Sequence, residues 1–155
     1  AAAKFNNAYG ETFKEPKELI QKEIAIIPGT DGKKMSKSYG NTIPLFGSKD
    51  EIAKAVMSIV TDSSGERPEN VYQIHKNFRS EAELAGIYET NKGSYKALKE
   101  ALIADIESLV GPMRAKRDAI SDDEVRKVLK EGSDKARVYA QNKMKEVRQK
   151  IGISF

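Results

Sequence analysis

Apolar side chains recur at helical spacing over much of the second half of the chain. Between residues 95 and 113 they lie three or four positions apart, which is the spacing of one face of an α-helix. This stripe consists of Tyr95, Leu98, Leu102, Ile106, Leu109 and Met113. Gly111 and Pro112 fall inside it, so we expect the helix to kink or break there.

Polar residues that favour helix ends divide the same region into segments. A serine is followed three residues later by glutamate at Ser48, Ser80 and Ser121, which is the pattern of a capping box. Glycines that follow apolar stripes are expected to close helices. We therefore predict a helical bundle over residues 46–155, with further helices capped by Asn70, Ser94 and Ser133 and with Gly93 and Gly132 closing two of them.

A different pattern precedes the helices. The apolar run at residues 24–27 predicts a short buried strand, which Pro28 and Gly29 end. The glycine-rich residues that follow, up to Asn41, predict a loop. This loop carries the ammonium groups of Lys33, Lys34 and Lys37 and the hydroxyls of Ser36 and Ser38. Such groups suit phosphate oxygens, although most lysine-rich loops are simply solvated surface.

Composition narrows the classes of function. The 155 residues include no cysteine, which excludes a disulfide scaffold or a cysteine-based zinc site and fits a cytoplasmic protein. No apolar run approaches the ~20 residues of a membrane span, so we expect no membrane partner. We also expect no metal site, and we interpret the single histidine, His75, as a surface or packing residue. Residues 111–155 carry 12 Lys/Arg against 7 Asp/Glu, which suits a polyanion such as RNA.

The loop also carries a specific signature. Residues 34–38 read Lys-Met-Ser-Lys-Ser, which is identical to the signature loop of class I aminoacyl-tRNA synthetases. A given pentapeptide is expected by chance in a chain of this length about once in ten thousand. The flanking Pro-Gly-x-Asp-Gly and Tyr-Gly-Asn resemble bacterial tryptophanyl-tRNA synthetases, as do Thr-Asp-Ser at residues 61–63 and Leu-Lys at 98–99.

The resemblance implies a role for each residue of the pentapeptide. In this family the loop covers the ATP phosphates while tryptophan is activated and pyrophosphate leaves. Cations that meet charge developing only in the transition state lower the barrier, and we expect Lys37 first and Lys34 second in that catalytic role. The implied ATP-binding residues are Lys34, Met35, Ser36, Lys37 and Ser38. Met35 has no charge to offer, so we expect it to anchor the loop to an apolar surface. Mg²⁺ is implied with ATP, but we assign it no residue here.

The resemblance also implies a mostly α fold divided between two domains. Residues 1–45 would be the end of a Rossmann-type α/β catalytic domain, with its last strand and signature loop, and residues 46–155 a helical domain that binds the tRNA anticodon. The basic candidates for contact with tRNA are Arg114, Lys116, Arg117, Lys135, Arg137, Lys143 and Arg148. A solvated helix face is an equal alternative for them.

The first residues resemble the last turns of a helix closed by Gly10, without a start signal. We therefore expect a C-terminal fragment that is inactive alone and that belongs to a homodimeric enzyme charging tRNA-Trp with L-tryptophan. The alternative is a non-catalytic helical RNA-binding module whose loop binds phosphate. A natural start codon near Ala1 would favour the module, whereas an upstream Rossmann half would favour the enzyme.

Overall fold

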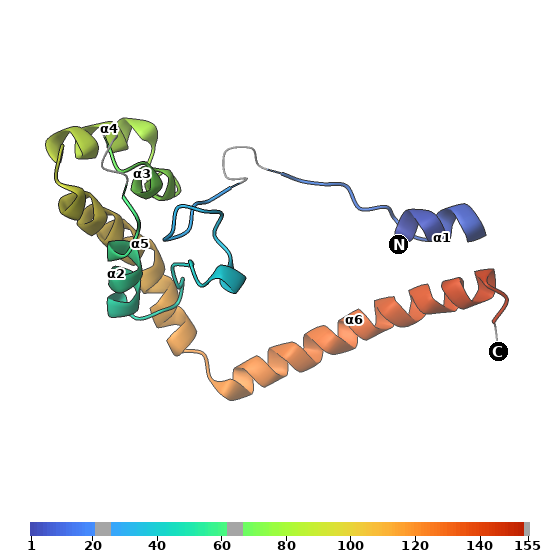
Figure 1. Cartoon of the computed structure of the whole chain (residues 1–155). Helices are drawn as coiled ribbons and strands as arrows, with labels where there is room; N and C mark the ends of the chain where they lie inside the picture. The colour runs from blue at the N-terminus through green and yellow to red at the C-terminus, as the bar shows by residue number, and fades with distance from the viewer. Residues whose placement is uncertain (21–25, 62–66, 154–155) are drawn as a thin grey trace. The chain divides into compact units, whose positions relative to one another are not determined.

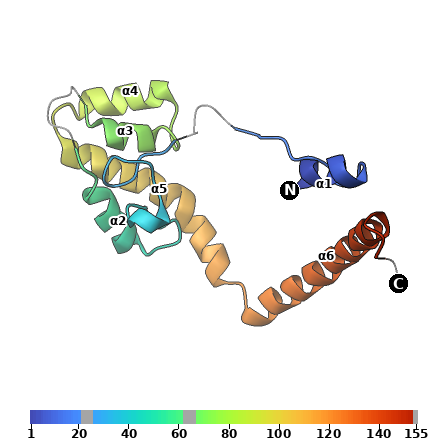
Figure 2. The ribbon, with the colours of Figure 1, turned by 45° about the vertical axis from the view of Figure 1, so that its right-hand side comes forward.

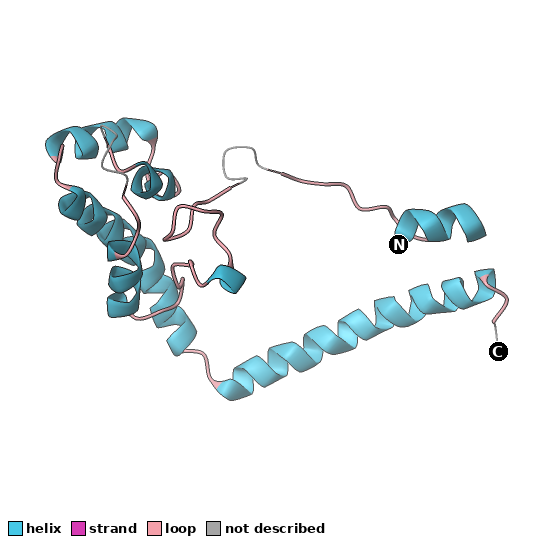
Figure 3. Cartoon of the chain, viewed as in Figure 1, coloured by secondary structure: helices cyan, strands magenta, loops and turns pink. Residues whose placement is uncertain are grey.

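The computed structural model describes residues 1–20, 26–61 and 67–153 (Figure 1). Within these ranges it is mostly helical, as predicted, and no strand is assigned (Figure 3). The predicted strand at residues 24–27 lies partly outside the described residues, and its described end leads into an isolated bridge between Pro28 and Lys34. The helices are α1 (Ala2–Tyr9), the 3₁₀ turn η2 (Lys37–Tyr39), α2 (Lys49–Met57), α3 (Glu69–His75), α4 (Glu81–Thr90), α5 (Tyr95–Asp118) and α6 (Asp122–Lys150).

The chain forms two compact units. One comprises residues 21–119, with the loop and helices α2 to α5, and the other combines residues 1–20 with residues 120–155. The loop and α2 to α5 fall in the same unit. The division into domains at residues 45 and 46 stays a prediction.

Helix α5 is the centre of the larger unit, and α2, α3 and α4 all pack against it (Figure 2). The main core lies between α2, α3 and α5, and a second cluster joins α3, α4 and the start of α5. Burying a side chain of this size contributes about 1.5–3 kcal/mol. The main core contains Ile52, Val56, Ile59, Val71, Ile74, Leu102, Ile106 and Val110, and the second contains Tyr72, Leu84, Tyr88 and Leu98.

Most helix starts were predicted correctly. Ser48 and Ser80 form complete capping boxes, and the hydroxyls of Ser94 and Ser121 accept backbone N–H groups of their helices. The prediction that Asn70 caps a helix over residues 71–78 was wrong, because α3 begins at Glu69. The Asn70 side chain instead donates to the carbonyl of Val60 (2.9 Å).

The expected break in α5 was also wrong. The helix continues past Gly111 and Pro112 as far as Asp118. Pro112 is exposed, so water can solvate the carbonyl that loses its intrahelical N–H donor. The buried stripe turns to Val110, whereas Leu109 and Met113 remain nearly half exposed. A helix of 3.6 residues per turn places residue 110, rather than 109, over residues 102 and 106.

The smaller unit contains α1 and α6. Gly10 closes α1 with a positive φ of 81°, as predicted, and Lys143 and Lys150 donate to the carbonyls of Thr12 and Glu11. The expected break at Gly132 was wrong, because α6 is a single helix of 29 residues. A closing glycine adopts a left-handed φ, whereas Gly132 stays helical. The cost of one glycine in a helix, about 1 kcal/mol, is too small to interrupt the hydrogen-bond ladder.

Candidate phosphate-binding loop

Short backbone contacts define the loop between residues 28 and 41. The N–H of Gly29 donates to Lys33 (2.6 Å), that of Gly32 to Gly29 (3.0 Å) and that of Met35 to Ile27 (2.9 Å). A Cβ on Gly29 would lie 2.4 Å from the Asn41 side chain, so no larger residue fits there without a shift. The segment therefore folds back on itself, with residues 33–35 beside residues 27–29 and residues 36–40 leading on to Asn41.

Asn41 joins the two sides of this loop. Its side chain is buried, and its amide nitrogen donates to Asp31 Oδ1 (2.7 Å) and to the carbonyl of Lys34 (3.2 Å). Its amide oxygen accepts the N–H of Ser36 (2.8 Å). The hydrogen bond from Asn41 is the main reason why the pKa of Asp31 is lowered. Sequence reasoning missed this role, although the Tyr-Gly-Asn flank pointed to the position.

Met35 anchors the loop to an apolar surface, as predicted. Its half-buried side chain lines a pocket of apolar residues from the loop, α3 and α5. The other lining residues are Ile27, Ile43, Leu45, Ile74, Asn77, Phe78 and Ile106, several of which pack on the main core. The Met35 side of the pentapeptide thus lies against the helices of the larger unit.

The charged side of the loop faces solvent. Lys33, Lys34 and Lys37 are exposed, and their ammonium groups make no hydrogen bond or ion pair with another described residue, although the charge of Lys33 interacts with Asp31. The hydroxyls of Ser36 and Ser38 lie 2.8 Å apart, and Lys37 begins the turn η2. The arrangement gathers ammonium and hydroxyl groups on the outside of an anchored loop, which can bind phosphate oxygens.

The seven basic candidates for tRNA contact differ in whether their side chains are already paired with other residues. The guanidinium of Arg114 is paired with Glu107 (2.9 Å), and both side chains are less than one-fifth exposed. Three candidates have exposed or backbone partners: Arg117 bonds Asp118 and the Phe46 carbonyl, Arg137 lies 3.9 Å from Asp134, and Lys143 contacts Glu146 and the carbonyl of Thr12. The exposed Lys116, Lys135 and Arg148 have no side-chain partner in the described part of the chain. Arg114, Lys116 and Arg117 lie in the larger unit and the others in the smaller one.

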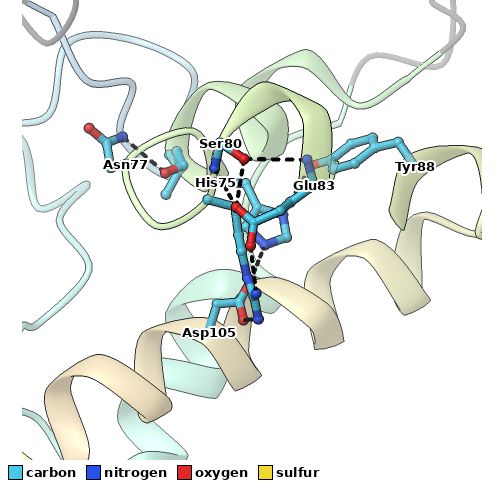
Figure 4. Close-up of polar contacts among 8 residues, drawn as sticks. His75, Asn77, Ser80, Glu83, Tyr88 and Asp105 are labelled. Carbon is cyan, nitrogen blue, oxygen red and sulfur yellow. Dashed lines mark hydrogen bonds and ion pairs between the residues drawn. The ribbon is translucent and has the colours of Figure 1, made fainter. Parts of the chain in front are cut away.

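A polar network around the buried His75 in the larger unit was not predicted from the sequence (Figure 4). His75 is fully buried, as one expects of a packing residue, and its Nε2 lies 2.8 Å from Asp105 Oδ2. The Asp105 carboxylate also accepts two hydrogen bonds from Arg79, which contacts Glu83 in turn. Arg79 and then His75 lower the pKa of Asp105, while burial raises that of the Tyr88 phenol, whose oxygen lies 3.5 Å from His75 Nδ1.

Two kinds of feature are absent from the part of the chain that the structure describes. No three His, Cys, Asp or Glu side chains lie close enough together to hold a metal ion. No described helix combines the length and apolar character that crossing a bilayer requires.

The comparison with protein families decides the assignment. Residues 1–130 match the family described as tRNA synthetases class I (W and Y). The chain belongs to this family. The signature pentapeptide of this class I synthetase chain lies in the loop described above. Its methionine lines the apolar pocket and its lysines are exposed.

Relatives of this synthetase chain share its whole length. It is 41% identical to the tryptophan–tRNA ligase of Fusobacterium nucleatum and 39% identical to that of Rhodopirellula baltica, each over 98% of the chain. It also resembles a crystal structure of tryptophanyl-tRNA synthetase from Campylobacter jejuni complexed with ADP and tryptophan. That similarity has a TM-score of 0.79 and 34% identity and covers 97% of this chain and 51% of the other. The synthetase chain thus spans about half the length of the curated relatives it matches, 50% and 51% for the first two.

Proposed function

We propose that this chain supplies the signature loop and the helical domain of a tryptophan–tRNA ligase, which activates L-tryptophan with ATP and transfers it to tRNA-Trp. The observation that carries the proposal is the anchored loop with exposed lysines, in a chain similar over almost its whole length to such ligases. The rest of the nucleotide site and the tryptophan pocket would lie in the other half of the enzyme. The domain assignment, residues 1–45 catalytic and 46–155 helical, is part of this proposal.

The loop would act on the ATP phosphates. As pyrophosphate leaves, negative charge grows on the departing oxygens, and Lys37 and Lys34 would stabilise it. Ser36 and Ser38 would donate hydrogen bonds to phosphate oxygens or hold the shape of the turn. Met35 would keep the loop seated on the helical unit while the lysines reach the nucleotide. Mg²⁺ would accompany ATP and neutralise phosphate charge.

Three further features belong to the proposal. The partners are tRNA-Trp, ATP and L-tryptophan, the complete enzyme is a homodimer, and it acts in the cytoplasm, in keeping with a cysteine-free composition. The basic residues of 111–155 would contribute to tRNA binding through phosphate contacts.

Pyrophosphate exchange tests the proposal. The chain would be joined behind the N-terminal half of the Fusobacterium nucleatum ligase, and this fusion is called the complete enzyme below. We expect tryptophan-dependent exchange of pyrophosphate into ATP by the complete enzyme and none by the 155-residue chain alone. Exchange by the chain alone would contradict the need for a second half. A folded fusion that binds tRNA but shows no exchange would favour the non-catalytic RNA-binding module.

Binding of tRNA should depend on the exposed basic residues of α6. Replacing Lys135 and Arg148 with Glu in the complete enzyme should weaken tRNA-Trp binding and reduce the slope of log affinity against log salt by about 2, one for each lost phosphate contact. Filter binding between about 50 and 200 mM salt measures both quantities. The matched control is Lys92→Glu with Lys96→Glu, which makes the same charge change in the larger unit. An unchanged slope in the α6 variant would contradict the assignment.

A further inference from the structure

A buried lysine of α5 holds the end of α2. The side chain of Lys99 is largely buried, and its ammonium donates to the carbonyls of Met57 (2.9 Å) and Ile59 (2.7 Å). Carbonyls at the C-terminal end of a helix have no intrahelical donor, so they need such a partner when they are buried. Burial lowers the pKa of Lys99, because the interior disfavours its charged form. Desolvation of the ammonium is the cost of this arrangement.

The segment that Lys99 holds is joined directly to the base of the signature loop. The N–H of Val60 donates to the carbonyl of Thr30 (2.8 Å), and the N–H of Thr30 donates to the carbonyl of Asn41 (2.9 Å). Asn70 closes the same junction from α3 by donating to the Val60 carbonyl (2.9 Å). Thr30 lies near the start of the loop and Asn41 at its end. A series of hydrogen bonds therefore runs from Lys99, through the backbone of residues 57–60, to both of these positions.

We propose that Lys99 is a positioning residue for the signature loop: its ammonium fixes residues 57–60, which fix the base of the loop relative to α5. This inference rests on the proposed function, because it assigns the loop a catalytic task. An apolar side chain would fill the same space without burying a charge, but the carbonyls of Met57 and Ile59 would lose their hydrogen bonds to the ammonium and be freer to reorient. A lysine meets both carbonyls at once and so restrains the path of the backbone that leads to the loop.

Amide hydrogen exchange on the 155-residue chain tests the structural half of the proposal. In Lys99→Met we expect the amides of Val60, Thr30 and Met35 to exchange at least about 10-fold faster, while Val56 inside α2 changes little, since local opening raises exchange only where contacts are lost. Lys96→Met, which loses an exposed lysine one turn earlier, should leave all four unchanged. Equal acceleration of Val56 would mean that Lys99 only stabilises the fold and would overturn the proposal.

Chemical restoration of the amine at position 99 separates loss of the ammonium from poor folding of a Lys99 variant. Because the chain has no cysteine, Lys99→Cys can be alkylated in denaturant with 2-bromoethylamine, which rebuilds an amine of nearly lysine length. After refolding, the alkylated chain should recover slow exchange at Val60 and Thr30, and the unalkylated chain should not. Rapid exchange in both would overturn the proposal.

The functional half is tested on the complete enzyme. Lys99→Met should lower the rate of adenylate formation by about 10-fold per active site, counted by active-site titration, with the KM for tryptophan unchanged, because a misplaced catalytic group costs rate rather than binding. A normal rate per site, with the exchange effect present, would overturn the link to catalysis. If the parent enzyme itself shows no exchange of pyrophosphate, the proposed function fails, whereas the amide measurements still decide whether Lys99 positions the loop.

Discussion

Replacing Lys37 with alanine in the complete enzyme is expected to lower the rate of adenylate formation by roughly 100- to 1,000-fold while leaving the affinity for tryptophan nearly unchanged. Lys37 is an exposed residue of the loop at the start of the turn η2. Its ammonium makes no hydrogen bond or ion pair with another described residue. Its charge would therefore be available to the departing pyrophosphate. An interaction made only in the transition state lowers the rate, and not ground-state binding, when it is removed.

Lys33→Ala is the matched control for Lys37→Ala. Lys33 is exposed on the same loop but lies outside the pentapeptide, and its own backbone N–H is held by Asp31 (3.0 Å). Its removal should cost much less, since a solvated ammonium contributes little. Pre-steady-state kinetics of the two variants separates the possibilities. Equal losses would mean that the loop acts through its summed charge, and a normal rate for Lys37→Ala would show that another residue has the role.

The second large effect concerns stability. Asp105→Ala should lower the free energy of unfolding of this chain by about 2 kcal/mol, because removal of the carboxylate leaves a fully buried imidazole without compensation, whereas the guanidinium of Arg79, whose side chain is 41% exposed, can be solvated. His75 would lose its partner at Nε2, and Arg79 would lose both of its hydrogen bonds to the carboxylate. Urea denaturation followed by circular dichroism measures the change. Asp123→Ala provides the control, since this aspartate is 92% exposed and, among the described residues, its side chain pairs with Arg126 alone on the surface of α6.

The same variant has a defined pH dependence. The pKa of Asp105 is lowered in the folded chain, chiefly by Arg79 and then by His75. Its ionised form therefore contributes stability fully above the unfolded pKa of about 3.9, and this contribution is lost as the pH falls through the folded value. As the carboxylate of Asp105 takes up a proton, the gap in stability between the parent and Asp105→Ala should narrow below about pH 4. A gap that is the same at pH 3 would show that the carboxylate charge is not what stabilises the network.

Features encoded locally were the ones that could be predicted from the sequence. The capping boxes at Ser48 and Ser80 and the closure at Gly10 all depend on residues a few positions apart. The pentapeptide likewise pointed to the loop before any contact was visible. These signals identified the family, the mostly helical fold and the candidate phosphate-binding residues.

The remaining features depend on contacts between distant residues. His75 meets Asp105 across 30 positions, and Lys99 meets Met57 across 42, so no local pattern announces either pair. The expected breaks at Pro112 and Gly132 failed for a different reason. Each weakens a helix by a limited amount, and the uninterrupted hydrogen bonding of the long helices α5 and α6 outweighs it.

The position of Met35 limits how far Lys37 can move. The backbone N–H of Met35 donates to the carbonyl of Ile27 and its side chain lines the apolar pocket, whereas Lys37 is only two residues further along the chain. Two residues span at most about 7 Å, so the backbone of Lys37 cannot leave a sphere of that radius while Met35 stays in place. Confinement of this kind gives the ammonium a high effective concentration at a nearby phosphate without any stronger contact. Met35, the residue of the motif without charge or hydroxyl, thus limits the space that the neighbouring lysine side chains can reach.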